Sequence, residues 1–115
     1  MRKIERQMNA AITAGKDWKS ANTQVTVTYF AHADRLIDRT TVFLHGSPIA
    51  QITPDTVTIC DYGYQTATTK SRLNAILHEL CGAGIYQKDR IWYGHALEEA
   101  DWKIEPNSSH CFVRG

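Results

Sequence analysis

The chain has 115 residues, of which 43% are hydrophobic and 22% are charged, and its formal net charge is +1. This composition is typical of a soluble globular protein and excludes a disordered chain, and the length suits a single domain with its own core. The near-neutral charge argues against an acidic surface that imitates DNA, and against a strongly basic nucleic-acid binder with a pI above about 9. We therefore expect residues 1–115 to form one compact domain.

The charges are unevenly distributed along the chain. Residues 1–20 carry five cations against two anions, and residues 95–105 carry one cation against four anions. Such polarity suits electrostatic steering towards a partner, although it also arises by chance on a small domain. The three cysteines, Cys60, Cys81 and Cys111, have no CxxC spacing and are odd in number, which favours reduced thiols in a cytosolic protein. Neither a signal peptide nor a membrane-spanning run is expected.

The first half of the chain predicts one helix followed by strands. Apolar residues recur with helical spacing over residues 4–12, and Gly15 is a natural stop. We expect Trp18 to fold back onto the core. Residues 24–29 alternate strictly between apolar and polar side chains, which predicts a half-buried strand. Residues 31–39, which include Leu36 and Ile37, are expected to be a loop or a short helical turn inserted between two strands.

Three further strands are predicted at residues 41–45, 49–52 and 56–60, with turns at residues 46–48 and 54–55. They would form an antiparallel meander whose common apolar face holds Val42, Leu44, Val57 and Ile59. A helix follows over about residues 69–80, with Thr68 or Thr69 as its N-cap and Gly82 and Gly84 at its end. Its apolar stripe is formed by Leu73, Ile76, Leu77 and Leu80.

The last part of the chain predicts a short hairpin, with strands at residues 85–87 and 90–93 around a turn at Lys88 and Asp89. The tail from His95 holds enough apolar residues to dock on the domain: Leu97, Trp102, Ile104 and Phe112. The expected fold class is α+β, with an antiparallel sheet of about five to six short strands and two helices packed on one face.

The start of the second predicted helix is the best candidate for a binding site. Thr68, Thr69, Lys70, Ser71 and Arg72 would bring hydroxyls, two cations and free N–H groups to the positive end of the helix dipole. These groups suit a phosphate or a carboxylate. The alternative is a well-capped helix whose lysine and arginine are simply solvated.

Aromatic residues near this helix are the other binding candidates. Tyr62 and Tyr64 are expected to alternate across the end of a strand, where they would stack on a base, anchor a protein interface, or only complete the edge of the core. On the late hairpin, one of Trp92 and Tyr93 must face the core and the other the outside. The binding residues predicted from the sequence are Tyr62, Tyr64, Thr68, Thr69, Lys70, Arg72 and Trp92.

The sequence contains no catalytic signature. The five histidines, at positions 32, 45, 78, 95 and 110, have no metal-ligand spacing with one another or with a cysteine. No nucleophile lies in an activating motif, and the helix start lacks the glycines of a phosphate-binding loop. We therefore expect a protein that is not an enzyme, with no catalytic residue, no metal and no cofactor.

Several segments resemble small uncharacterised accessory proteins of tailed bacteriophages, with similarity over most of residues 4–93. They are Asn22-Thr-Gln-Val25, Leu44-His-Gly-x-x-Ile-Ala50, Tyr64-Gln-Thr-Ala-Thr-Thr-Lys-Ser-Arg-Leu-Asn74, and Tyr86-Gln-Lys-Asp89 followed by Ile-Trp-Tyr93. The resemblance carries no activity and no catalytic residue. It implies a compact protein, located in the host cytoplasm, that binds and disables a host machine.

Two functions follow as hypotheses. The first is a phage-encoded, non-enzymatic inhibitor, such as an anti-CRISPR protein, that acts by stoichiometric binding to a host protein or ribonucleoprotein complex. The second is a small nucleic-acid-binding module that uses the aromatic and basic surface at the start of the second helix. The sequence predicts no membrane partner and leaves the oligomeric state and the target open.

Overall fold

The computed structural model describes residues 1–115, except for the side chains of His32 and Ile37. What the sequence suggested for these two side chains therefore lies outside the described part of the protein. The chain forms two helices and nine strands. Their bounds are α1 Lys3–Ala14, β1 Trp18–Ser20, β2 Thr23–His32, β3 Arg35–Leu44, β4 Ser47–Ile52, β5 Thr56–Cys60, α2 Ala67–Cys81, β6 Gly84–Lys88, β7 Ile91–His95, β8 Trp102–Ile104 and β9 Ser109–Val113.

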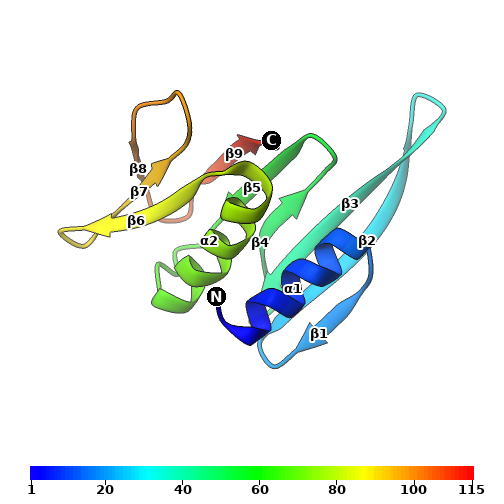
Figure 1. The fold of residues 1–115 in the computed structure, drawn as a ribbon, viewed down its shortest axis with the longest axis horizontal. Coiled ribbons are helices and arrows are strands. Elements are labelled where there is room, and N and C mark those ends of the chain that lie inside the picture. The colour runs from blue at the N-terminus through cyan, green and yellow to red at the C-terminus, as the bar shows by residue number, and fades with distance from the viewer.

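The strands form two antiparallel sheets (Figure 1). The larger sheet has six strands in the order β1-β2-β3-β4-β5-β9, and the smaller has three in the order β6-β7-β8. The predicted α+β class and the antiparallel meander are confirmed, but the late hairpin belongs to a separate sheet. The tail supplies one strand to each sheet, because β8 pairs with β7 and β9 pairs with β5.

The core cluster combines buried residues of the large sheet with buried residues of both helices. All four residues expected on one face of the meander are buried, and so are Leu73, Ile76 and Leu77 of α2, whereas Leu80 is only partly buried. The same cluster includes Met8 and Ile12 of α1. Gly15 ends α1 with a left-handed φ of 64°, a conformation that favours glycine at this position.

The segment between β2 and β3 differs from the sequence-based expectation. Residues 31–39 are not a loop or an insertion, because β2 and β3 continue as one long hairpin from Thr23↔Leu44 to His32↔Arg35. The turn consists of Ala33 and Asp34, which have φ values of 50° and 64°. This is the two-residue hairpin geometry in which both central residues are left-handed. The sequence did not reveal it because neither residue is glycine.

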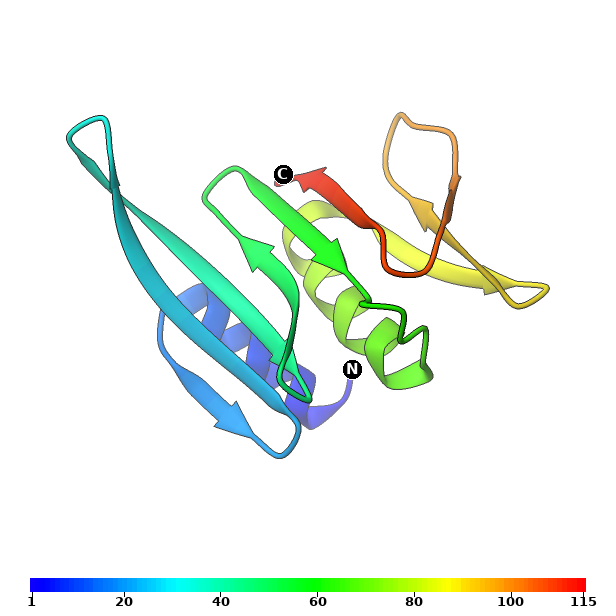
Figure 2. The ribbon, with the colours of Figure 1, turned by 180° about the vertical axis from the view of Figure 1, so that it is seen from behind.

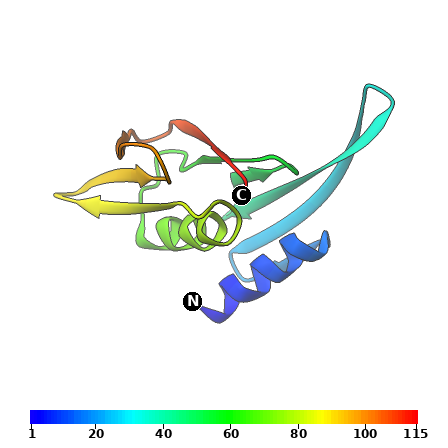
Figure 3. The ribbon, with the colours of Figure 1, turned by 45° about the horizontal axis from the view of Figure 1, so that its top comes forward.

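The outer part of this hairpin, residues 27–39, projects from the rest of the molecule and is called the arm here (Figure 3). It is paired on neither side by a third strand. β1 reaches only to the pair Trp18↔Val25, and β4 reaches only to Thr40↔Ile52. The molecule is accordingly elongated, with principal extents of 46 × 33 × 23 Å.

The β6–β7 hairpin and the tail also differ in detail. The turn residues are Asp89 and Arg90, with φ values of 52° and 67°, one position later than predicted. In the tail, Ile104 and Phe112 are buried and Trp102 packs partly against the core, whereas Leu97 is 77% exposed and does not dock. Trp102 lies on Gly94, where a side-chain methyl would overlap the indole ring.

Candidate functional site

The second helix begins at Ala67, two residues earlier than the sequence suggested. Its N-cap is Thr66, whose hydroxyl oxygen accepts a hydrogen bond of 3.1 Å from the backbone N–H of Thr69. The hydroxyls of Thr66 and Thr69 also lie 2.9 Å apart. The prediction of Thr68 or Thr69 as the cap is therefore wrong by two or three positions. Threonine was the right type of residue for the cap. Residues 66–69 are all threonine or alanine, so the sequence alone does not determine where the helix starts.

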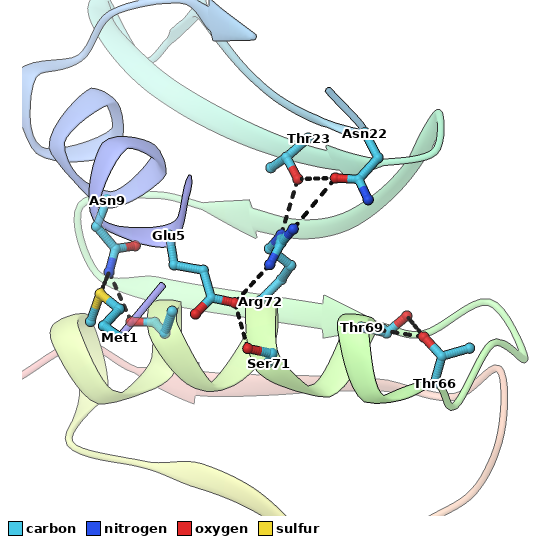
Figure 4. A network of polar contacts seen from close by, with 10 residues as sticks. Met1, Glu5, Asn9, Asn22, Thr23, Thr66, Thr69, Ser71 and Arg72 are labelled. Carbon is cyan, nitrogen blue, oxygen red and sulfur yellow. Dashed lines mark hydrogen bonds and ion pairs between the residues drawn. The ribbon is translucent and has the colours of Figure 1, made fainter. Parts of the chain in front are cut away.

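Arg72 is buried in a network that joins both helices to β2 (Figure 4). Its Nη1 lies 2.8 Å from Oε2 of Glu5 in α1, and both side chains are only 4% exposed. Its Nε donates to Oγ1 of Thr23 at 3.0 Å, and its Nη2 donates to Oδ1 of Asn22 at 3.4 Å. Ser71 donates to the same Glu5 oxygen as Arg72. We call these five residues the polar junction.

The polar junction overturns the expectation that Lys70 and Arg72 converge at the helix start. Arg72 points inward and is neutralised by Glu5. Lys70 lies on another side of the helix, where its Nζ is 3.4 Å from Oε1 of Gln87 in β6. Ser71 is also committed to Glu5. The three polar side chains therefore do not form one anion-binding cluster.

A pocket of about 470 Å³ does lie beside the start of α2. Three of the predicted binding residues, Tyr64, Thr68 and Thr69, line it. The facing wall comes from the β3–β4 turn and includes His45 and Ser47. The predicted binding site therefore lies beside a concavity, although the pocket lining includes no lysine or arginine.

The loop before α2 is organised by Asp61, which is buried. Its Oδ1 accepts from the backbone N–H groups of Gly63 at 2.8 Å and Asn107 at 2.7 Å, and its Oδ2 accepts from Gln65 at 3.1 Å. Tyr62 and Tyr64 lie in this loop after the end of β5, not across a strand end as predicted. They are 41% and 65% exposed, so both remain available to a partner.

Trp92 is the other predicted binding residue that the structure relocates. It is 2% exposed and belongs to the core, where it pairs with Ile104 of β8. Tyr93 takes the outward position and stacks on Tyr86, with ring centroids 5.4 Å apart. The rule that one of the two must face inward holds, but the tryptophan was assigned to the wrong face.

A surface cluster on the small sheet was missed by the sequence analysis. Asp101 accepts from the Tyr86 hydroxyl at 2.7 Å and lies 2.6 Å from Nδ1 of His95. The hydrogen bond from His95, followed by that from Tyr86, lowers the pKa of Asp101, while the bond to Asp101 raises the pKa of Tyr86. Asp101 lies on the loop before β8, and no sequence pattern linked it to Tyr86.

The arm was also missed as a surface feature. Tyr29 is 65% exposed, Leu36 is 77% exposed and Phe30 is 36% exposed. The Arg39 guanidinium lies over the Phe30 ring, 4.9 Å from its centroid. The available signal was that the strand predicted at residues 24–29 is followed by Phe30 and Ala31 without a turn residue.

The described side chains include no group of three or more His, Cys, Asp or Glu residues placed to hold a metal ion. The three cysteines are free, and burial raises the pKa of the Cys81 thiol. Neither helix in the described chain is long and apolar enough to cross a membrane.

Comparison with known proteins gives one match. The family model described as Kyanoviridae Gp96 protein matches residues 1–114. No curated protein and no solved structure matches the chain. The matched region covers nearly the whole sequence and agrees with the resemblance to accessory proteins of tailed bacteriophages. The chain therefore belongs to the Kyanoviridae Gp96 protein family, a family of cyanophage proteins.

Proposed function

We propose that this protein is a non-enzymatic phage protein that binds a host macromolecular complex stoichiometrically and thereby inhibits it. A host defence complex, such as a CRISPR–Cas ribonucleoprotein, is the target class that we put first, and the host cytoplasm is the compartment. Membership of a phage protein family supports the setting of this proposal. The observation that carries it is the arm, which presents apolar side chains away from the body of the domain.

Three apolar residues of the arm, Tyr29, Ala31 and Leu36, form one stripe. In the register of the hairpin, Tyr29 faces Asp38 and Ala31 faces Leu36, so these residues share the face that Val25 and Val42 bury nearer the core. Small monomeric proteins rarely expose large contiguous apolar patches without an interaction to cover them. Tyrosine is also enriched among the residues that contribute most to protein interfaces. This stripe therefore supports a protein partner.

The two edges of the arm provide a second means of binding. Because each arm strand pairs only with the other, outward backbone N–H and C=O groups are left for a partner along both edges. An extended segment of another protein can add to such an edge as a further strand. Asp17 occupies one of these positions, since its Oδ1 accepts from the Val27 N–H at 2.8 Å.

We also infer that both helices pack on one face of the six-stranded sheet. Both contribute to the same core cluster, and Figures 1 and 2 draw them on the same side of that sheet. The helices end short of the arm, which explains why the apolar stripe continues into solvent. The alternative of a nucleic-acid site at the start of α2 is less favoured, because Arg72 is committed to Glu5.

The test is an affinity purification from phage-infected host cells, with the tagged protein and with the double variant Tyr29→Ser and Leu36→Ser. We expect one host complex to be enriched by the unchanged protein and at least about tenfold less by the variant, as the loss of two interface anchors predicts. Adding the purified protein to the purified complex should then inhibit it, with saturation at a fixed molar ratio.

The matched control is the double variant Tyr64→Ser and Leu97→Ser. Tyr64 and Leu97 are 65% and 77% exposed, as are Tyr29 and Leu36, but they lie outside the arm. The control should retain the complex. Loss of the complex with the control and its retention with the arm variant would move the site to the pocket beside α2. Complete inhibition by much less than one molecule of this protein per complex would contradict stoichiometric binding, because each molecule would then inactivate many complexes.

A further inference from the structure

The face of the six-stranded sheet opposite the core carries a pattern of its own. Val25 and Val42 are paired and buried, so the neighbouring pairs Gln24↔Phe43 and Thr26↔Thr41 point the other way. The same alternation places Thr28, Phe30, Arg35 and Arg39 on this outer face, and Lys19 joins it opposite Gln24. We call it the open sheet face.

The charge of the open sheet face has one sign. Lys19, Arg35 and Arg39 are exposed cations, and the register places no aspartate or glutamate of any of the six strands on this face. The nearest strand carboxylate, Asp38, lies on the opposite face of the arm with Tyr29. A protein with a net charge of only +1 thus gathers three cations on one surface, with no strand carboxylate among them.

The cations are arranged in a line. Arg35, Arg39 and Phe43 are successive fourth residues of β3, and Lys19 lies in the row of Phe43 through Gln24. At about 3.4 Å per strand residue, neighbouring rows are about 14 Å apart and the line is about 27 Å long. Thr26 and Thr41 lie between the rows of Arg39 and Phe43, and Phe30 lies between the rows of Arg35 and Arg39. This pattern fits a long, flexible polyanion better than a single small anion.

The aromatic residues decide which polyanion fits. Phe43 is half-buried at one end of this line, and the Arg39 guanidinium lies over the Phe30 ring, 4.9 Å from its centroid. Rings and guanidinium planes bind unpaired bases by stacking, whereas the bases of a duplex already stack on one another. We propose that the open sheet face binds an extended single strand of nucleic acid. The three cations contact its phosphates, and Phe43 stacks on a base.

This inference goes beyond the proposed function, because it concerns the face of the sheet opposite the apolar stripe. It is tested by fluorescence anisotropy with labelled oligo-dT, oligo-U and a DNA duplex, each at 50 and 200 mM salt. Three phosphate contacts predict that affinity for a single strand falls roughly 20-fold over this range of salt.

The decisive variant is Lys19→Gln with Arg35→Gln and Arg39→Gln. It should weaken single-strand binding at least about tenfold at 50 mM salt and remove most of the salt dependence. Phe43→Leu, which keeps an apolar side chain but loses the ring, should weaken binding roughly fivefold or more. The matched control is Arg2→Gln with Lys3→Gln and Lys16→Gln, which removes the same charge from exposed positions at the two ends of α1. It should bind like the unchanged protein.

Four outcomes would overturn the proposal. The first is no binding of any oligonucleotide up to about 100 µM protein, the weak end of non-specific binding. The second is an equal loss from both triple variants, which indicates diffuse attraction. The third is equal affinity for the duplex, which contradicts base stacking. The fourth is equally tight binding of polyglutamate, which would assign the face to an acidic protein.

Discussion

The polar junction and the arm of this protein invert the usual relation between residue type and burial. In the junction, Glu5 and Arg72 are charged, yet both are almost completely buried and bonded to each other. In the arm, Tyr29 and Leu36 are large and apolar, yet most of each side chain is exposed. Each of the three guanidinium nitrogens of Arg72 has a hydrogen-bond partner, whereas Tyr29 and Leu36 remain largely exposed.

The difference separates stability from binding. A buried ion pair between two helices, with hydrogen bonds to a strand, determines how these elements dock. Removing one partner leaves the other charge buried, with neither an ion-pair partner nor water around it. An exposed apolar stripe contributes little to the stability of the fold, because folding does not bury it. The free energy gained by burying it is therefore available for binding a partner. The cation that appeared most functional in the sequence is therefore structural. The segment that appeared to be a variable insertion carries the binding surface that we propose.

The largest effect is expected from Arg72→Met. The change leaves the Glu5 carboxylate buried without its ion-pair partner, which should reduce the free energy of unfolding by about 3–5 kcal/mol. Urea denaturation at pH 7 measures the effect. The double variant Glu5→Leu with Arg72→Met should recover much of the loss, and failure to do so would mean that packing rather than charge was lost.

A pair of leucines compares the two regions with the same chemical change. Leu77 is 0% exposed in the core, so Leu77→Ala should cost about 2–5 kcal/mol of unfolding free energy. Leu36 is 77% exposed on the arm, so Leu36→Ala should change it by less than about 0.5 kcal/mol. Chemical denaturation of both variants is the measurement. A large cost at Leu36 would show that the arm contributes to folding and would contradict its assignment as a free surface.

A smaller effect distinguishes the observed helix cap from the predicted one. Thr66→Ala removes the acceptor for the Thr69 N–H and should cost about 1 kcal/mol. Thr68→Ala, two residues further along the chain, should cost less than about 0.5 kcal/mol, because Thr68 does not cap the helix. Thermal and urea denaturation of the two variants should give this order. Equal costs would place the start of α2 elsewhere.

The smallest effect is expected from the exposed cluster of Asp101, which forms polar contacts like those of the junction but in solvent. The lowered pKa of Asp101 means that the folded protein favours the charged carboxylate. The resulting contribution to stability is present at pH values above the pKa that Asp101 has in the unfolded chain. It is lost as the pH falls through the lower pKa of the folded state. The stability difference between the unchanged protein and Asp101→Asn should therefore be constant above about pH 5 and shrink below about pH 4. Urea midpoints across this range test it, and a difference that grows with acid would contradict the assignment.

Much of the fold follows from local patterns in the sequence. The helix that ends at Gly15, the meander and the apolar stripe of α2 were predictable, because burial on one side produces a periodicity of about 3.6 or of 2 residues. The separation of β6, β7 and β8 into a second sheet was not predictable. Strand pairing between distant segments, such as β5 with β9, depends on the whole packed structure and leaves little trace in either strand alone.

The candidate site was predicted only in part. A pocket lies beside the start of α2, where the binding site was predicted, and Tyr64, Thr68 and Thr69 line it. The roles of Arg72 and Trp92 were predicted wrongly. An arginine in a first helical turn and a tryptophan on a hairpin have the same local sequence pattern whether they face solvent or the core.

The sequence by itself determined the α+β class, the main elements and the membership of a phage protein family, because these depend on residue type and local periodicity. Only the tertiary structure decided which charged residue is buried and which apolar residues are exposed. Arg72 is buried because Glu5, 67 positions away, comes within 2.8 Å of it. Tyr29 and Leu36 are exposed because α1 ends before it can cover the arm. Both outcomes depend on the distance between segments that are remote in sequence, which no local pattern records.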